Sequence, residues 1–322
     1  MSPSQPQRIL VIKLSALGDF ILSIASFQAI RRHHPKAHIT LLTTKPFAGL
    51  GEASGCFDAV WTDTRPRWSD VSEWWSLRRR LRGGRFDRVY DLQRSQRSAW
   101  YFRLAGRPEW VGTAAGCSHH YVDPPPPLPH VTEREAAQLA LAGIDDIGLP
   151  DLSFLQADIG RFALPAPTAL LVPGSAPHRP AKRWPAAGFA DLARELVGRG
   201  LTPVLIGTAA ERDAVAAVAA GCPEARDLSG KTGLEDLVAL GRAAVLAVGN
   251  DTGPMHLIAA AGCPSLALFS ADSDPVQVAP RGPSVALLRQ DSLQDLALDR
   301  VLAAIETLGV PARPTAPAAA KP

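Results

Sequence analysis

Cysteine is scarce in this chain and is not arranged for a metal centre or a disulfide framework. Among 322 residues the four cysteines, none close to another in sequence, are Cys56, Cys117, Cys222 and Cys263. Zinc sites and disulfide scaffolds are typically marked by closely spaced cysteines. The adjacent histidines His119 and His120 have no third ligand at a useful spacing, so we expect no metal.

Two motifs of nucleotide-binding proteins are also missing. No Gly-x-Gly-x-x-Gly follows a predicted strand, which argues against a nicotinamide or flavin cofactor. The P-loop pattern Gly-x4-Gly-Lys-Ser/Thr is absent as well. We therefore expect no cofactor.

Long apolar runs are lacking too. The longest, residues 257–269, is interrupted by Gly262 and Pro264 and is too short to span a bilayer. The first seven residues are polar and contain proline, so we expect no signal peptide and a cytoplasmic protein. The net charge of +3 is too small to indicate a nucleic-acid partner.

What the chain does have is a regular alternation of strand and helix patterns. Hydrophobic residues make up 46% of it, enough for the cores of two domains. In the first half we expect strands at 8–14, 38–44, 57–61 and 87–92, and helices at 20–30, 70–82, 96–104 and 133–142. The proline-rich residues 118–130 are expected to form an irregular loop, and 149–167 an interdomain linker.

The second half restarts the same alternation. We expect strands at 169–172, 201–206, 244–249, 265–269 and 284–288. We expect helices at 186–199, 211–220, 234–242 and 293–308, and a further helix that the turn at 250–256 opens and that runs to residue 261. Such alternation predicts an α/β fold with parallel sheets and helices on both faces. From residue 311 the composition is rich in proline and alanine, so a disordered tail is expected at 311–322.

The turn after the first predicted strand concentrates polar groups. Lys13, Ser15, Gly18 and Asp19 stand between this strand and the next helix. In open α/β sheets, ligands bind at the carboxyl ends of the strands, where this turn lies. Asp19 fits two roles, a helix N-cap and a catalytic base, and nothing local decides between them.

A second turn, Asn250-Asp-Thr-Gly-Pro-Met-His256, also joins a strand to a helix. The N–H groups of Thr252 and Gly253, together with the helix dipole, predict a phosphate site. The carboxylate of Asp251 would repel a bound anion, so its side chain is expected to point away from the anion and to brace the turn. His256 lies one turn into the helix, where it can reach a ligand.

Further candidates follow the neighbouring strands. Pro173-Gly174-Ser175 ends one strand, and Lys182 then supplies a mobile ammonium, although taken alone Lys182 fits a solvated lysine ahead of a helix better. Glu211 follows the 201–206 strand, where Rossmann-like folds place an acid on ribose hydroxyls. Together these residues predict a nucleoside diphosphate pocket in the second half.

Arginine is dense between residues 78 and 107. Ten arginines fall there, against only Asp87 and Asp91. Residues 78–85 fit a solvated basic helix face, whereas Arg94 and Arg97 follow a strand and lie on the ligand side. The planar guanidinium suits phosphate and carboxylate, so a polyanionic acceptor or an anionic membrane surface fits this region.

Three motifs in this order and spacing resemble glycosyltransferase family 9, the lipopolysaccharide heptosyltransferases. They are Lys13-Leu-Ser-Ala-Leu-Gly-Asp19, Pro180-Ala-Lys-Arg-Trp-Pro185 and Asn250-Asp-Thr-Gly-Pro-Met-His256. The resemblance covers nearly the whole chain, up to about Leu308. It implies GT-B architecture, in which two facing Rossmann-like domains enclose the active site. It also implies an inverting, metal-independent transferase, and the best-known donor of the family is ADP-L-glycero-D-manno-heptose.

The resemblance also implies roles for individual residues. Asp19 would be the general base and Lys182 the cation that neutralises the diphosphate. Glu211 would hold the ribose and Thr232 would border the adenine. The implied donor-binding set is Ser175, Glu211, Thr232, Asp251, Thr252, Gly253, Pro254 and His256, and the acceptor-binding set is Lys13, Ser15, Arg94 and Arg97. Residues 78–123 match no subfamily signature, so the acceptor stays open.

These inferences assign the acceptor to an N-terminal Rossmann-like domain at 1–155 and the nucleotide sugar to a C-terminal one at 156–310. The expected partners are an ADP-heptose donor, a lipopolysaccharide core or lipid-linked acceptor, and the inner membrane surface through peripheral contact. Two alternatives stay open: a sugar-nucleotide epimerase on the same fold, and a non-catalytic sugar-nucleotide-binding protein. The first would release a free sugar without acceptor, and the second would bind donor without transfer.

Overall fold

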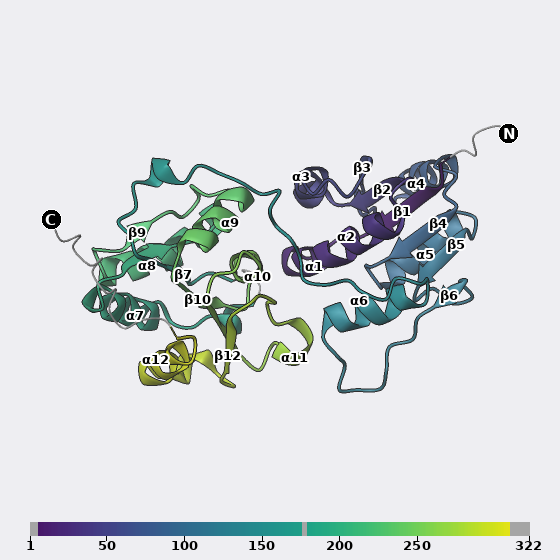
Figure 1. Ribbon diagram of the computed structural model, residues 1–322. Coiled ribbons are helices and arrows are strands. Elements are labelled where there is room, and N and C mark those ends of the chain that lie inside the picture. Colours follow the sequence, from purple (N-terminus) through teal and green to yellow (C-terminus); the bar gives the residue numbers. More distant parts are fainter. Residues whose placement is uncertain (1–5, 176–178, 310–322) are drawn as a thin grey trace. The chain divides into compact units, whose positions relative to one another are not determined.

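A computed structural model describes residues 6–175 and 179–309 (Figure 1). The chain divides into two compact units, Met1–Phe154 and Leu155–Pro322, here called domain 1 and domain 2. The tail predicted at 311–322 lies outside the described residues. Within those residues, no helix is both long and apolar enough to cross a membrane.

Domain 1 is built on a six-stranded sheet with the order β3-β2-β1-β4-β5-β6, and its paired strands are parallel. The strands are β1 (Arg8–Ile12), β2 (His38–Thr43), β3 (Ala59–Thr62), β4 (Arg88–Asp91), β5 (Glu109–Gly112) and β6 (His119–His120). The central strand β1 is Arg-Ile-Leu-Val-Ile, and its last four residues are fully buried. An apolar run of this kind is typical of a strand covered on both faces.

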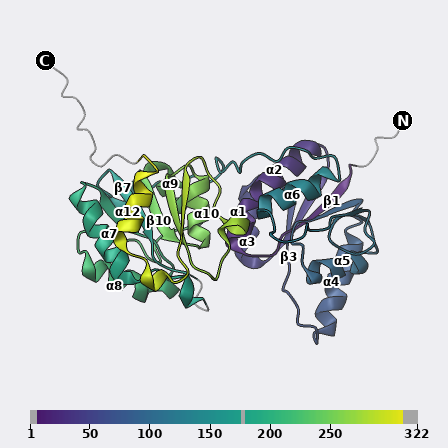
Figure 2. The same ribbon diagram turned by 90° about the horizontal axis from the view of Figure 1, so that it is seen from below.

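Helices cover both faces of this sheet. One face carries α1 (Leu17–Leu22), α2 (Ile24–His33), α3 (Lys45–Ala53) and α6 (Val131–Ala140), and the other carries α4 (Val71–Gly83) and α5 (Gln96–Leu104), as Figure 2 shows. Leu77 and Leu81 of α4 and Tyr101 of α5 pack on Leu10 and Val89 of the sheet. The predicted parallel α/β fold is thus confirmed for the first half.

Domain 2 repeats the architecture with the order β12-β11-β10-β7-β8-β9, again with parallel pairs. Its strands are β7 (Thr168–Val172), β8 (Thr202–Leu205), β9 (Arg226–Asp227), β10 (Leu246–Asn250), β11 (Ser265–Phe269) and β12 (Val285–Arg289). Its helices are α7 (Ala186–Gly198), α8 (Arg212–Gly221), α9 (Leu234–Ala243), α10 (Gly253–Ala260), α11 (Pro275–Val278) and α12 (Leu298–Glu306).

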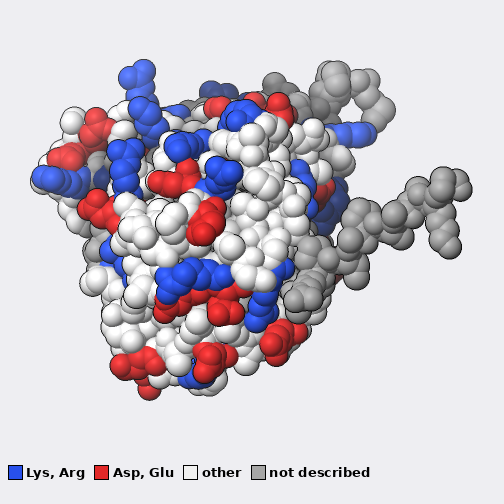
Figure 3. All heavy atoms as spheres, turned by 90° about the vertical axis from the view of Figure 1, so that its left-hand side faces the viewer, with Lys and Arg blue, Asp and Glu red and all other residues white. Residues whose placement is uncertain are grey.

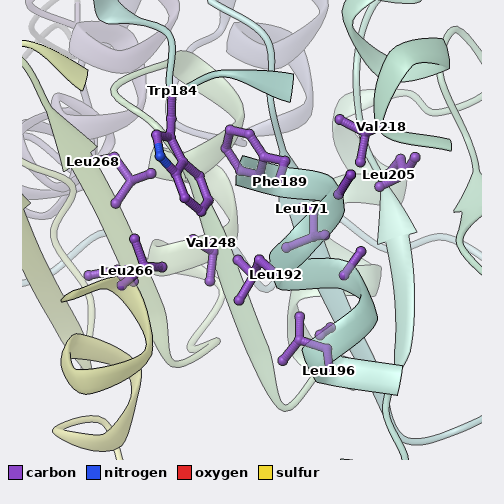
Figure 4. Packing of buried hydrophobic residues seen from close by; sticks show 14 of the residues in the cluster. Leu171, Trp184, Phe189, Leu192, Leu196, Leu205, Val218, Val248, Leu266 and Leu268 are labelled. Carbon is purple, nitrogen blue, oxygen red and sulfur yellow. The ribbon is translucent and has the colours of Figure 1, made fainter. Parts of the chain in front are cut away.

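The core of domain 2 lies between α7 and the sheet. Trp184 and Phe189, with ring centroids 4.9 Å apart, pack over Leu171 and Val248 (Figure 4). The indole Nε1 of Trp184 donates to the carbonyl of Leu296 at 2.9 Å, so the buried ring leaves no unpaired donor. This packing fixes the loop that carries Lys182, two residues before the tryptophan.

Several predicted elements differ from the structure. The helix expected at 20–30 is broken at Ser23, whose hydroxyl oxygen lies 2.8 Å from the carbonyl oxygen of Asp19, a contact that bends helices. The loop expected at 118–130 begins with β6, paired with β5. The closing helix expected at 293–308 is a 3-10 turn at Leu293–Asp295 followed by α12.

Candidate functional site

Asp19 lies at the carboxyl end of β1, at the third position of α1. Its Oδ2 accepts the N–H of Ala16 at 3.3 Å, so the residue closes a capping box rather than serving as the N-cap, which is Ala16. The expectation of Asp19 as an N-cap is therefore wrong by position, although the carboxylate does satisfy one free donor of the helix. The side chain is half-buried, so solvent or a ligand can reach it.

Neighbouring segments hold this turn firmly. The side-chain oxygen of Gln93 accepts the N–H groups of Leu14 at 2.7 Å and Ser15 at 3.1 Å, and Thr44 Oγ1 donates to the Leu14 carbonyl at 2.8 Å. The turn is thus tied to the segments that follow β4 and β2. Fixing the backbone just before Asp19 limits the positions that its carboxylate can adopt.

Lys13 is not at the surface of this turn but beneath it. The residue is 3% exposed, and its Nζ donates to Glu135 Oε1 at 2.9 Å and to the Leu92 carbonyl at 3.2 Å. Glu135, fully buried on α6, also accepts the hydroxyls of Ser23 at 2.6 Å and Ser26 at 2.7 Å. The ammonium is therefore engaged internally, and its predicted contact with an acceptor stays a prediction.

We expect Glu135→Gln to destabilise domain 1 by about 3–5 kcal/mol, because Lys13 would keep a buried charge without a counter-charge. The free energy of unfolding, measured by urea denaturation, checks this. Glu133→Gln is the matched control, since Glu133 is exposed on the same helix and its replacement should change stability by less than about 0.5 kcal/mol. Adding Lys13→Met to Glu135→Gln should recover part of the loss, and equal stabilities of all three variants would contradict the assignment.

Arg94 and Arg134 form a basic site at the same edge of the sheet. Arg94 Nη1 lies 3.8 Å and Arg134 Nη1 3.5 Å from Asp123 Oδ1. The Arg94 side chain is only 8% exposed, and its Nη1 has no hydrogen-bond partner among the described residues. Burial lowers the pKa of Arg94. The two guanidinium groups share the single carboxylate of Asp123, and neither is within close hydrogen-bond distance of it. Their unused N–H groups could therefore bind a further anion.

Asp91 ends β4 and is fully buried below this site. Its Oδ1 accepts the N–H groups of Gln93 at 3.2 Å and Arg94 at 3.3 Å. Burial raises the pKa of Asp91 from 3.8 to about 6, against the opposing effect of these N–H groups. The carboxyl therefore binds a proton more tightly in the folded protein than in the unfolded chain.

The stability of the protein should consequently depend on Asp91 between about pH 4 and pH 6. There the folded state keeps a proton that the unfolded chain has released, so the stability contributed by Asp91 falls as pH rises, by about 3 kcal/mol over the window. Asp91→Asn removes this dependence. The measurement is the free energy of unfolding of the variant minus that of the parent. This difference should rise by about 3 kcal/mol from pH 4 to pH 7, because only the parent loses stability over that range. A difference that stays constant with pH would contradict the prediction.

In domain 2, Lys182 and Asp251 are brought together by two different loops. Lys182 Nζ donates to Asp251 Oδ2 at 2.6 Å, and their side chains are 11% and 8% exposed. The hydroxyl of Ser273 donates to the same oxygen at 2.6 Å. Lys182 is thus held in place rather than mobile, which corrects the expectation, and Asp251 braces the turn as expected.

Asn250 joins the two strand ends that carry these residues. Its Nδ2 donates to the carbonyls of Pro173 at 2.8 Å and Gly174 at 3.4 Å, and its Oδ1 accepts the N–H of Trp184 at 3.0 Å. The ends of β7 and β10 and the Lys182 loop therefore form one braced unit. Sequence analysis assigned Asn250 no role, since an amide at a strand end carries no signal of its distant partners.

The N-terminus of α10 directly follows this brace. Thr252 is its N-cap and Pro254 occupies the first turn. Proline has no N–H group, so Pro254, a member of the implied donor-binding set, cannot donate a backbone hydrogen bond to the ligand. The N–H groups of Thr252 and Gly253 are the donors available to an anion here. His256, in the next turn, is buried at 5% exposure.

The remaining donor candidates lie at the ends of β7 and β8. Glu211 Oε2 accepts the N–H of Thr208 at 2.8 Å and its hydroxyl at 2.9 Å, and the carboxylate packs on Gly174, where an added Cβ would lie 2.0 Å from Oε1. Ser175 is buried, and its hydroxyl accepts from Arg183 Nε at 3.1 Å. Thr232 precedes α9 in a loop bonded to Gly207, so all three share the carboxyl edge of the sheet.

The two remaining acceptor candidates are placed differently. Ser15 lies in the turn of Asp19 and is half-buried. Arg97 lies on α5, with its guanidinium carbon 5.4 Å from the ring centroids of both Trp68 and Trp74. Its charge therefore faces aromatic rings. Among the described residues, no group of three or more His, Cys, Asp or Glu side chains could hold a metal ion.

Comparison with known proteins agrees with this arrangement. Residues 74–300 match the model of glycosyltransferase family 9 (heptosyltransferase). Lipopolysaccharide heptosyltransferase 2 of Escherichia coli (strain K12) is 29% identical over 293 residues, which cover 83% of each chain. The structure of E. coli ADP-heptose lps heptosyltransferase II aligns with 27% identity and a TM-score of 0.74, covering 94% of this chain and 98% of that one.

A further structure shares the fold. The E. coli heptosyltransferase WaaC, solved with ADP, aligns with a TM-score of 0.75 and 21% identity, covering 94% of this chain and all of that chain. That structure therefore has the fold of the α/β domains described above.

Proposed function

Because the chain belongs to glycosyltransferase family 9, we propose that it transfers heptose from ADP-heptose to a lipopolysaccharide core or a related glycolipid. The observation that carries this proposal is the family match at residues 74–300, which covers the second half of domain 1 and most of domain 2, including the Lys182 loop and the turn at the start of α10. The relative E. coli enzyme, named for ADP-heptose and lipopolysaccharide, supports the choice of donor and acceptor.

In the proposed mechanism, Asp19 takes the proton of the acceptor hydroxyl as that oxygen attacks the anomeric carbon. A carboxylate on a braced turn, with one long hydrogen bond and partial access to solvent, suits a positioned base. A single displacement of ADP then inverts the anomeric centre. Base catalysis of this kind contributes on the order of 10²–10⁴-fold.

The departing ADP develops negative charge, which domain 2 would stabilise. Lys182 supplies an ammonium beside the N-terminus of α10, and the N–H groups of Thr252 and Gly253 add two donors. We propose that this set replaces the divalent metal used by other transferases. Glu211 and Thr232 would contact the ribose and the adenine, with Ser175, Asp251 and His256 supporting them.

The acceptor would meet domain 1 at its basic site. Arg94 and Arg134 share one carboxylate and retain capacity for an anion, so a carboxylate or phosphate of a lipopolysaccharide core fits them. Ser15 and Arg97 complete the proposed acceptor contacts. A lipid-linked acceptor would also require peripheral contact with the cytoplasmic face of the inner membrane.

The proposal is tested by incubating the purified protein with ADP-heptose and a panel of truncated core acceptors. We expect a mass increase of one heptose on one acceptor, release of ADP, and the same rate when EDTA is present. Free heptose released without acceptor would instead favour an epimerase or hydrolase. Calorimetric binding of ADP-heptose with no product on any acceptor would favour a non-catalytic binding protein.

A further inference from the structure

Helices α4 and α5 and the loop before α4 present an exposed surface of tryptophan and arginine, here called the aromatic–arginine face. We propose that this face docks on an anionic lipid bilayer. The inference deepens the proposed function, on which it rests for the lipid acceptor, and names the part of the chain that would contact the membrane.

The apolar part of the face is a groove between the two helices. It has a volume of about 430 Å³ and is lined mainly by Trp68, Val71, Trp74, Trp75, Trp100 and Leu104. Trp68, Val71 and Trp75 are each more than 60% exposed, and Trp100 is 46% exposed. Large aromatic side chains are costly to leave in water, so a cluster of them at the surface indicates an interaction site.

The aromatic rings are organised rather than loose. Trp68 stacks on Trp74 with centroids 4.9 Å apart and planes inclined by 12°, and Trp100 meets Trp68 edge-on at 6.3 Å. The Arg97 guanidinium lies 5.4 Å from the centroids of Trp68 and Trp74. Folding therefore presents these rings as one preformed surface, which reduces the entropy lost on docking.

Arginines extend the same exposed helix surfaces. On α4, Arg78 and Arg79 follow Trp75 by three and four residues, and Arg78 lies 5.1 Å from its ring centroid. On α5, Arg103 stands three residues after Trp100, 4.8 Å from that ring. Residues three and four apart share a helix face, so each exposed tryptophan has a guanidinium beside it.

The balance of charge selects an anionic partner. From Arg65 to Arg107 the chain has twelve arginines against four acidic residues. No acidic residue in the described part of the chain lines the groove, and two acids close to its residues in sequence accept local hydrogen bonds: Asp70 Oδ2 accepts the N–H of Arg67, and Glu73 accepts from the Thr64 hydroxyl. By contrast, acidic and basic side chains are interspersed on the face of domain 2 drawn in Figure 3.

Tryptophan and arginine together match the interface of a bilayer. Indole rings reside at the headgroup level, and arginines attract anionic headgroups while their stems cover apolar surface. A small soluble anion would use the arginines but not an apolar groove. A second copy of the chain would bring like charges together. An anionic bilayer offers an interfacial region for the tryptophans and negative charge for the arginines.

The position of the groove fits such an acceptor. Strands β3 and β4 lead into α4 and α5, so the first turns of both helices lie at the carboxyl edge of the sheet. Val71, Trp75, Arg97 and Trp100 are in the first two turns, and Arg94 stands just before α5. Docking through this face would bring the basic site of domain 1 close to the headgroups.

The test is co-sedimentation of the full chain with vesicles of phosphatidylcholine alone or mixed with phosphatidylglycerol. We expect binding only to the anionic vesicles, and binding weakened by at least about 30-fold for Arg78→Glu/Arg79→Glu, because the loss of two arginines alone accounts for that factor. Trp75→Ser should also weaken binding. The matched controls Arg226→Glu/Arg300→Glu and Leu149→Ser change exposed residues outside the face and should bind like the parent.

Neither vesicles nor sedimentation involve donor or transfer, so this result is independent of the proposed activity. Equal binding by the Arg78/Arg79 and Arg226/Arg300 variants would overturn the proposal. Dimerisation of the parent that is lost in Trp75→Ser, with no vesicle binding, would also overturn it by identifying a second copy as the occupant. If the transferase is active, the Arg78/Arg79 variant should lose activity on vesicle-embedded acceptor and keep it on a soluble, deacylated one.

Discussion

Asp19→Asn should lower kcat by about 10²–10⁴-fold while leaving the affinity for ADP unchanged. The substitution is nearly isosteric, and the amide oxygen of asparagine can still accept the N–H of Ala16, so α1 keeps its cap. What is lost is the group that takes the proton. Initial rates with saturating donor and acceptor, together with calorimetric titration of ADP, measure the two quantities separately.

The competing interpretation of Asp19 is purely structural, and it predicts a different outcome. If the carboxylate only caps the helix, the loss of activity should follow the loss of stability, on the order of 1 kcal/mol for a cap. Asp151→Asn is a suitable control, because Asp151 accepts the N–H of Ser153 in domain 1 without a proposed catalytic role. Unaltered turnover in Asp19→Asn would remove the general base from the mechanism.

Lys182→Met should lower kcat/KM by about 10²–10³-fold, the magnitude typical of losing one preorganised group that stabilises developing negative charge. The structure adds a second effect. Asp251 is 8% exposed and would keep its carboxylate with Ser273 but without the ammonium, so the variant should also be less stable. Steady-state kinetics and thermal denaturation of the same preparation measure both effects.

The double variant Lys182→Met/Asp251→Asn separates these effects. Removing the carboxylate together with the ammonium relieves the unpaired buried charge, so stability should recover. Activity should stay low, because the ammonium proposed to face the diphosphate is still missing. Recovery of both quantities would show that Lys182 acts only as the structural partner of Asp251.

The strands that sequence analysis predicted include those with continuous apolar runs. Residues 9–12, 169–172 and 265–269 are apolar or small and fully buried, so their pattern is unambiguous. By contrast, β5 is only Glu-Trp-Val-Gly after a proline, and β6 and β9 are two residues each. Such segments become strands because a neighbouring strand pairs with them, and that cannot be read locally.

Helix α3 was missed for a related reason. It contains Pro46 in its first turn and glycines at 49 and 51, which weaken any helical pattern. Yet Pro46 is tolerated at a helix start, and Gly51 lies so close to Leu41 that an added Cβ would be 2.5 Å from it. The packing of α3 on β2 and β3 thus compensates for its poor helix propensity.

In the candidate site, too, contiguous motifs were predicted from the sequence, whereas contacts between residues far apart in the sequence were not. Sequence motifs placed Asp19 and the Asn250–His256 turn at strand ends, because all residues of each motif are consecutive in the sequence and can be recognised together. Glu135 was missed because its partner Lys13 is 122 residues away, and a glutamate on an amphipathic helix looks solvated. The pairing of Lys182 with Asp251 spans 69 residues and likewise depends on the tertiary fold.

Each domain has its own sheet and its own apolar core, and no strand pairs across the division at Phe154 within the described residues. Heat should therefore melt the protein in two calorimetric transitions rather than one. A nucleotide held by domain 2 would delay only the transition of that half, so the melting curve itself would report which half the donor occupies.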